Sequence, residues 1–324
     1  MTPGAVIKVL PGFKGDAVVI KQGDQRGVHA SYGCIRGGVI DAGRMPLVGL
    51  RVEYACRLQI ADIEIRDALQ KGIHMAEGWY EVNVANVRIN VDLKTRNAPG
   101  SVGLHYGEKC GDSLVSSVVV IGYETGVRSD SFSNDFQLVH VWNCDDTQGP
   151  MLHCFYCNGW GDSYSQCYAD SPTIAGFYVS KPCQRIIANR VYYSRWAADD
   201  AGAGILITPG ATHGLYLGNY FTADEKHRLA RAIDGDLNSA TILGNSFSPS
   251  VRGGRAAQVP SRGGGASAMP PLDVAGPTLR LTQPLACPPA PDSGSVGDIA
   301  WGESKGESYL MLRTASGWKK ARLE

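Results

Sequence analysis

The chain has 324 residues, enough for one large core or two modest domains. Lys plus Arg and Asp plus Glu number 31 each, so no basic excess indicates nucleic acid or an anionic membrane as a partner. No apolar run approaches the roughly 20 residues of a membrane span. We therefore expect no nucleic-acid binding and no membrane insertion. The 40 Gly residues and a charged fraction of 19% favour short strands and turns over long amphipathic helices.

The N-terminus begins almost inside a strand pattern, at residues 5–9, without the charged start or apolar run of a signal peptide. This pattern predicts that a segment upstream has been removed. Further along, Leu58, Ile60, Ile63 and Ile65 alternate in pairs with a break of one residue between the pairs. The same pattern returns at residues 82–89, and it predicts two short strands with a corner between them.

A third strand in each repeat is predicted from short, mostly apolar alternations whose starts lie 23 to 31 residues apart. These alternations start at Gly72, Gly103, Gly126, Met151, Gly176 and Gly204. Three strands at this spacing predict one triangular coil of a solenoid.

An Asn two residues before an apolar side chain marks another column of the repeat. Asn189, Asn219 and Asn245 are separated by 30 and 26 residues, which again corresponds to one coil. We expect these Asn residues at corners, where each amide bonds to the backbone of neighbouring coils. They set the register and are not counted as ligands.

The nine Cys residues include Cys154 and Cys157, flanked by Cys144 and Cys167, a spacing that would allow a tetrahedral zinc site. The favoured interpretation is a stack of buried thiols, because Cys144 and Cys167 lie 23 residues apart, about one coil. The odd number and even scatter of Cys also argue against a disulfide framework and favour folding in a reducing compartment. We expect no metal and no cofactor.

Together these motifs resemble a known fold. The strands that open with Gly, the Gly-Asn-x-Phe corners at Asn219 and Asn245, and residues 35–41 (IRGGVID) resemble the pectate-lyase-like superfamily. The resemblance covers about residues 5–250, and within the superfamily the chain most resembles bacteriophage tailspikes and polysaccharide depolymerases. It implies an all-β fold, a right-handed single-stranded parallel β-helix with three short strands per coil, followed by a small C-terminal β module.

The composition predicts three regions along the chain. Residues 1–250 form the parallel β-helix, and the stretch 251–295 is a linker or covering segment rich in Pro and Gly. Residues 296–324 contain strand-like runs with aromatic anchors and form a small cap or oligomerisation module. A cap suits a solenoid because its terminal coils present unpaired backbone groups.

The resemblance also implies partners and a location. It implies a homotrimer that joins a virion tail through the missing N-terminal segment, is folded in the host cytoplasm and acts at the bacterial cell surface. The expected partner is a capsular or lipopolysaccharide glycan of the bacterium.

Outward side chains at one repeat position form a straight ladder, because parallel strands stack at roughly 4.8 Å. The position after Gly and one apolar residue supplies a predicted substrate-binding column, before Leu206 ends it: His74, His105, Arg128, His153 and Tyr178. An extended sugar chain fits along such a column. A register slip of one residue would instead turn these side chains into packing groups.

Glycoside hydrolysis needs two carboxyl groups, roughly 5 to 9.5 Å apart, and neighbouring coils supply such separations. The predicted catalytic residues are Asp130, Asp145, Asp146 and Asp162, and Trp160 and Tyr164 are predicted to stack on sugar rings. For each Asp the alternative is an ordinary role in a turn.

Two other functions remain open. The first is β-elimination from a uronic acid, with Arg128 beside His105 and His153, and with Tyr178 as the acid. The second is a spike that binds a surface glycan without cleaving it. We expect hydrolysis of a bacterial surface polysaccharide, with the lyase and the non-catalytic spike as the alternatives.

Overall fold

The computed structural model describes eight stretches of the first 247 residues and the backbone of six strands beyond them. These stretches are 4–21, 33–78, 80–91, 98–143, 151–193, 202–223, 231–237 and 239–247. The chain divides into two compact units, Met1–Ile242 with Ser246–Ala257, and Leu243–Asn245 with Gln258–Glu324. No helix occurs among the described residues, and hence none that is long and apolar enough to cross a membrane.

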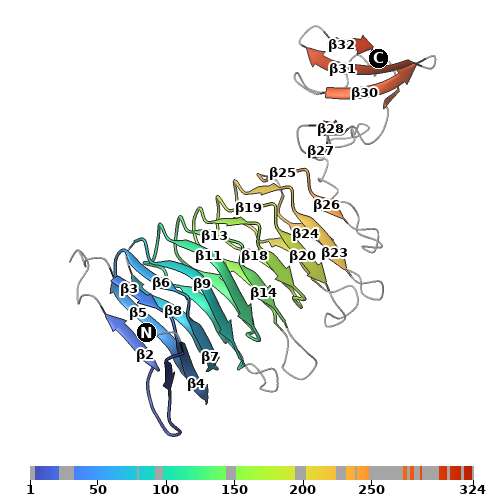
Figure 1. The fold of residues 1–324 in the computed structure, drawn as a ribbon. Helices are drawn as coiled ribbons and strands as arrows, with labels where there is room; N and C mark the ends of the chain where they lie inside the picture. The colour runs from blue at the N-terminus through green and yellow to red at the C-terminus, as the bar shows by residue number, and fades with distance from the viewer. Residues whose placement is uncertain are drawn as a thin grey trace. The chain divides into compact units, whose positions relative to one another are not determined.

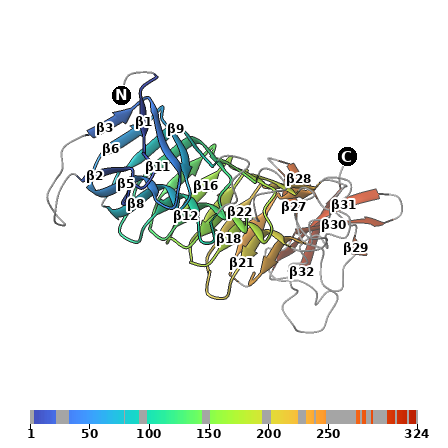
Figure 2. The same cartoon turned by 90° about the horizontal axis from the view of Figure 1, so that it is seen from below.

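The first unit is a parallel β-solenoid, which confirms the predicted all-β coil of three short strands (Figure 1). One strand of each coil belongs to a nine-stranded sheet, whose strands follow one another along one side of the solenoid (Figure 2). In order these strands are β2 (Val18–Lys21), β5 (Val48–Ala55), β8 (Lys71–Gly78), β10 (Val102–Tyr106), β12 (Thr125–Ser129), β15 (His153–Cys157), β18 (Ala175–Val179), β21 (Ala203–Ile207) and β24 (Arg231–Gly235).

The other two strands of each coil belong to a 17-stranded sheet that turns a corner. Its early strands are β1 (Val6–Lys8), β3 (Gly33–Arg36), β4 (Val39–Met45), β6 (Leu58–Ala61), β7 (Glu64–Ala68), β9 (Asn83–Asn90) and β11 (Leu114–Ile121). Its later strands are β13 (Asp135–Gln137), β14 (His140–Trp142), β16 (Ser163–Ser165), β17 (Tyr168–Asp170), β19 (Arg185–Ile187), β20 (Arg190–Tyr193), β22 (Leu215–Leu217), β23 (Tyr220–Ala223), β25 (Thr241–Leu243) and β26 (Ser246–Phe247).

The corner within this sheet is made by one residue per coil in the left-handed backbone region. Ala188 has φ +54° and Leu138 φ +53°, and the equivalent positions later in the chain are Gly218 and Gly244. A single left-handed residue breaks the alternation of the strand, which explains the extra residue between the paired apolar positions.

The predicted Asn corners are confirmed for Asn189 and Asn219, both almost fully buried. Asn219 Oδ1 accepts hydrogen bonds from the backbone N–H and the side-chain Nδ2 of Asn189, each at 3.0 Å. Asn219 Nδ2 donates to the carbonyl oxygen of Ile186 at 2.9 Å. The side chain therefore satisfies backbone groups that the turn leaves without partners in the sheet.

The core lies inside the solenoid, where each inward side chain packs on its equivalent in the next coil. Phe155 and Phe177 stack with centroids 4.6 Å apart, and Phe136 and Tyr164 do so at 4.8 Å. The Gly column is explained by this packing. A Cβ at Gly126 would overlap the side chain of Val141 and approach the carbonyl oxygen of Cys154 to 2.8 Å.

The Cys residues bear out part of the prediction. Cys154, Cys157 and Cys167 are free thiols buried in the core, and burial raises the pKa of Cys167 to about 12. Cys34 differs from the expectation because its thiol is exposed. Cys144 lies outside the described residues.

The second unit contains two separate groups of strands. The strands β27 (Asp273–Ala275) and β28 (Thr278–Arg280) form an antiparallel pair. The strands β30 (Ile299–Ser304), β31 (Glu307–Thr314) and β32 (Gly317–Arg322) form an antiparallel meander, and β29 (Leu285–Ala286) pairs with β30 in parallel. A role for these strands as a cap or trimer contact stays a prediction.

Candidate functional site

The nine-stranded sheet presents one outward side chain per coil at a fixed register position, which we call the outward column. Side chains alternate between the two faces of a strand, so the residue after each buried apolar position points out of the solenoid. The outward column consists of Arg51, His74, His105, Arg128, Tyr156, Tyr178, Leu206 and Asp234. Four of the five predicted members lie in it.

The fifth predicted member, His153, is not part of the outward column. The register pairs Tyr156 with Arg128 and Tyr178, whereas His153 pairs with Thr125 and Ala175. The prediction is wrong by three residues because Cys154 occupies the place of the usual Gly, so the repeat position falls three residues after the predicted start at Met151. His153 is only 9% exposed, and its Nδ1 has no hydrogen-bond partner among the described residues.

Asp130, directly after β12, accepts three hydrogen bonds: one from the preceding coil, one from its own coil and one from the next coil. Its Oδ2 lies 2.8 Å from Nε2 of His105 and 2.7 Å from Nε of Arg128. Its Oδ1 lies 2.7 Å from Nδ2 of Asn158, whose own Oδ1 accepts a bond from Ser180 at 2.7 Å. Both oxygens of this carboxylate are therefore occupied.

Lys71 lies at the start of β8 and joins two stacked imidazole rings to this network. Its Nζ is 2.8 Å from Nδ1 of His105 and 3.2 Å from Nε2 of His74, and the two rings stack with centroids 4.7 Å apart. Because Lys71 donates to Nδ1 of His105, the Nε2 of that ring carries the hydrogen that it donates to Asp130. We call Lys71, His74, His105, Arg128 and Asp130 the polar network.

Burial shapes the charges in the polar network. Burial lowers the pKa of Lys71, and Arg128 and Arg51 lower it further. Burial and the neighbouring Lys71 lower the pKa of His74 to about 3, and burial also lowers the pKa of His105. Burial opposes the charge of Asp130, but hydrogen bonds from His105, Arg128 and Asn158 outweigh it and hold its pKa well below the usual range. The network therefore combines neutral imidazoles with one fixed carboxylate.

An aromatic segment continues the outward column beyond the polar network. The Arg128 guanidinium lies 5.0 Å from the ring centroid of Tyr156, and Tyr156 stacks on Tyr178 at 4.8 Å. The ring of His153 packs beside both, 4.8 Å from that of Tyr178. A cationic end followed by aromatic rings offers charge pairing and apolar contact to an extended ligand.

Two of the other predicted residues lie inside the solenoid. Asp162 is fully buried at a corner, where its Oδ1 accepts the backbone N–H of Asn134 at 2.9 Å, and burial raises its pKa to about 6. Tyr164 is fully buried between Phe136 and Phe155. Their predicted roles in catalysis and substrate binding were wrong, because both side chains point inward.

Of the remaining predicted residues, Trp160 is described by the structure and is not on the outward column. Trp160 is 56% exposed and forms an isolated parallel bridge with Phe132 at the corner after the nine-stranded sheet. Asp145 and Asp146 lie outside the described residues.

Three residues of the site were missed by sequence reasoning. Lys71 precedes Gly72 at the first position of β8, whereas the predicted column uses the position two residues after each Gly. Tyr156 and Asn158 were displaced by the same register error that selected His153. The alternation Phe155, Tyr156, Cys157 contains the missing signal, since its buried and exposed positions match those of Val127, Arg128 and Ser129.

The neutral histidines make stability depend on pH. Burial lowers the pKa of His153 to about 4, and the pKa of His74 is about 3, whereas an unfolded His titrates near 6.5. Between pH 6.5 and about 4 the unfolded chain therefore binds protons that the folded chain does not. We expect these histidines to lower the free energy of unfolding as pH decreases through this window, with His153 contributing at most about 1.4 kcal/mol per pH unit. Asp162, whose pKa is raised to about 6, acts in the opposite direction, so the contribution of His153 is measured against a variant that keeps Asp162.

Urea unfolding at pH 7.5 and pH 5.0 measures this effect, and His153→Gln is the matched variant because Gln does not titrate. Its stability should change less between the two pH values than that of the wild type. Equal changes in both proteins would contradict a buried neutral His153. Asp130 does not contribute in this window, since its lowered pKa causes loss of stability only below about pH 4.

The comparisons with known proteins do not identify the activity. No family model and no curated protein matches the sequence. Among solved structures, similarity is found to a glycoside hydrolase, with 8% identity, a TM-score of 0.40 and coverage of 65% of this chain and 47% of that one. The chain thus spans about half the length of that protein.

Two further structures are similar at the same level. An alginate lyase from Paenibacillus sp. str. FPU-7 has 12% identity and a TM-score of 0.44, with coverage of 72% of this chain and 84% of that one. ORF18 of Geobacillus virus E2 has 10% identity and a TM-score of 0.45, with coverage of 90% and 67%. At these values the chemistry of this chain has to be argued from its own residues.

Proposed function

We propose that the protein binds an acidic polysaccharide along the outward column and cleaves it by β-elimination at the polar network. The observation that carries this proposal is the contact of Lys71 with two imidazole rings, two coils before the pair of Arg128 and Asp130, with His105 linking Lys71 to Asp130. The proposal departs from the hydrolysis expected first and adopts the alternative that the sequence left open.

Lys71 is suited to act as a base. A neutral amine has two N–H bonds and one lone pair, and His74 and His105 accept the two N–H bonds. The lone pair is then left for a substrate proton. Because burial and two guanidinium groups lower its pKa, more of the neutral amine is present near neutral pH than in an exposed Lys.

Arg128 is suited to bind the carboxylate of a uronic acid. Its side chain is 40% exposed, and its Nε is oriented by Asp130. Neutralising the substrate carboxylate acidifies the C5 proton, which passes to the Lys71 amine as the C4=C5 bond forms and the C4–O bond breaks. Tyr156 or Tyr178, the next members of the column, supplies a proton to the leaving oxygen.

Hydrolysis is less well supported by the described carboxylates. Asp130 has both oxygens hydrogen-bonded and a lowered pKa, which suits a group that orients His105 and Arg128 rather than one that donates a proton. Asp162 is fully buried. A pair of accessible carboxyl groups of the kind that glycosidases use is therefore not formed by these two residues.

The resemblance to tailspikes extends the proposal to the biological setting. We infer that the polymer is a bacterial capsular or lipopolysaccharide glycan and that the protein is a homotrimeric depolymerase of a virion tail. This part rests on analogy at the level of the fold. Light-scattering mass of the purified chain tests the trimer, and a monomer at all concentrations would contradict it.

Turnover tests the proposed chemistry directly. We expect incubation with acidic bacterial polysaccharides to produce new reducing ends together with the ultraviolet absorbance of an unsaturated uronate. Reducing ends without this absorbance would show a hydrolase and refute the elimination. Neither signal across a broad panel of capsular and lipopolysaccharide glycans would favour a spike that binds without cleaving.

A further inference from the structure

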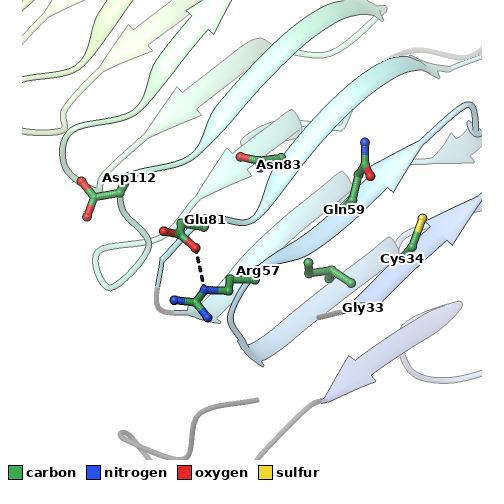
Figure 3. Close-up of a pocket in the computed structure, with 8 residues that line it drawn as sticks. Gly33, Cys34, Arg57, Gln59, Glu81, Asn83 and Asp112 are labelled. Atoms are coloured by element: carbon green, nitrogen blue, oxygen red, sulfur yellow. Dashed lines mark hydrogen bonds and ion pairs between the residues drawn. The ribbon is translucent and has the colours of Figure 1, made fainter. Parts of the chain in front are cut away.

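A second concave site lies on the 17-stranded sheet, beside the corner that follows the nine-stranded sheet. It is a cavity of about 720 Å³, within the range of roughly 300–1,000 Å³ that small-molecule sites occupy. Its lining comes from β3, β6, β9 and the corners between the two sheets: Gly33, Cys34, Arg57, Leu58, Gln59, Glu81, Asn83 and Asp112 (Figure 3). None of these residues belongs to the outward column.

Two columns of side chains form this pocket. Cys34, Gln59 and Asn83 are register partners on β3, β6 and β9, so their side chains point from the same face of successive strands (Figure 3). Arg57 and Glu81 each precede a member of this column by two residues. Since both columns repeat at the strand spacing of roughly 4.8 Å, the pocket is extended along the solenoid axis.

The second column, which consists of the corner residues Arg57, Glu81 and Asp112, adds charged side chains to the amides of the first. Arg57, Glu81 and Asp112 have φ of +56°, +63° and +53°, so each occupies a left-handed corner position of its coil. Arg57 Nε donates to Glu81 at 3.0 Å, and the dashed line in Figure 3 marks this ion pair. The lining thus contains one guanidinium and two carboxylates, which disfavours an anionic ligand.

Several hydrogen-bonding groups of the pocket remain available. Among the described residues, the Gln59 amide and the Asp112 carboxylate have no side-chain partner. Asn83 Oδ1 accepts the backbone N–H of Leu114 at 2.8 Å, which fixes the orientation of its amide and leaves the Nδ2 donors for a ligand. Amide donors and a carboxylate acceptor that line the same pocket match a hydroxyl-rich ligand, since each hydroxyl group both donates and accepts.

We propose that this pocket is a second, non-catalytic binding site for a neutral, hydroxyl-rich ligand, namely a short segment of an uncharged glycan. Other ligand classes fit the lining less well. Leu58 is the one large apolar residue among its members, and no group of three or more His, Cys, Asp or Glu residues able to hold a metal ion occurs in the described part of the chain. The site does not depend on cleavage at the outward column.

Titration of the full chain with neutral trisaccharides tests the proposal. The probes are trisaccharides of glucose, galactose, mannose and N-acetylglucosamine, with a hexuronate trisaccharide and inorganic phosphate as charged probes. Binding is followed by saturation-transfer NMR and calorimetry. We expect saturable binding of at least one neutral trisaccharide and weaker binding of both charged probes.

Two variants and a control connect binding to the pocket. Gln59→Ala and Asp112→Asn should each weaken the affinity about ten-fold, the effect of losing one or two hydrogen bonds. Asn tolerates the left-handed backbone of position 112, so the second variant changes the charge and not the corner. Gln137→Ala, at an exposed position of β13, should bind like the wild type.

Three results would overturn the proposal. These are the absence of binding by every neutral trisaccharide at millimolar concentration, a preference for hexuronate or phosphate, and wild-type affinity in both pocket variants. The binding test is independent of the outward column. A protein without any lyase activity would still bind the neutral probe in this pocket, and the two pocket variants would still weaken that binding.

Discussion

Replacing Lys71 with Met is expected to lower kcat on a cleaved acidic polysaccharide by about 10²–10⁴-fold, the usual contribution of a general base. Lys71→Arg should be equally inactive, because it retains the positive charge and the donors but remains protonated. This pair of variants separates a base from a group that merely holds His74 and His105 in place. Initial rates at saturating polymer concentration provide the measurement.

Lys109→Met is the matched control for this substitution. Lys109 is an exposed residue of the same solenoid whose Nζ pairs with Glu77 at 2.8 Å. Its loss should leave kcat unchanged. If Lys71→Arg retained at least half of the wild-type rate, the assignment of Lys71 as the base would be refuted, even if Lys71→Met were inactive.

Replacing Asn219 with Ala is expected to lower the free energy of unfolding of the solenoid by about 2–4 kcal/mol. The substitution leaves the backbone N–H of Asn189 and the carbonyl oxygen of Ile186 buried without their partner, and each unsatisfied buried group costs about 1–3 kcal/mol. Urea unfolding followed by circular dichroism measures the effect. Gln137→Ala, at an exposed strand position, should unfold at the wild-type urea concentration.

A shift for Asn219→Ala no larger than that of Gln137→Ala would show that the Asn corner does not stabilise neighbouring coils. The part of the unfolding curve that shifts in Asn219→Ala also shows which coils are destabilised. Solenoid coils contact mainly their neighbours, so destabilising one corner lowers the stability of the coils around it first.

The fold was predictable because a solenoid repeats its physical constraints in every coil. Gly72, Gly103 and Gly126 recur where a Cβ would overlap an inward side chain of the 17-stranded sheet, and such positions leave a visible mark in the sequence. The Asn corners are visible for the same reason, since Asn189 and Asn219 replace backbone partners that a left-handed turn removes. Repetition makes a weak local signal strong.

The site was less predictable because one coil lacks the Gly that marks the strand in its neighbours, so the repeat position in that coil was assigned three residues too early. Cys154 fills the position that Gly occupies in neighbouring coils, and its small side chain packs in the core with no Gly in the sequence to mark the strand. His153 was consequently placed where Tyr156 lies. The residues that line the pocket around Gln59 and Asp112 share no repeated motif comparable to the Gly column. The sequence therefore did not predict this pocket.

Inward and outward directions were also misjudged in the short strands of the larger sheet. Asp162 and Tyr164 follow a corner residue, Gly161, whose φ of +72° interrupts the alternation. Both side chains therefore point inward, although Asp162 was predicted to be catalytic and Tyr164 to stack on a sugar ring. A polar residue such as Asp162 inside the solenoid is possible because it accepts the backbone N–H of Asn134.

A crystal structure of the Lys71→Met variant soaked with a hexuronate trisaccharide tests the central claim most directly. The account predicts a sugar chain along the outward column, with a carboxylate on Arg128 and rings against Tyr156 and Tyr178. A trisaccharide bound elsewhere on the solenoid, with the outward column empty at saturating concentration, would contradict it.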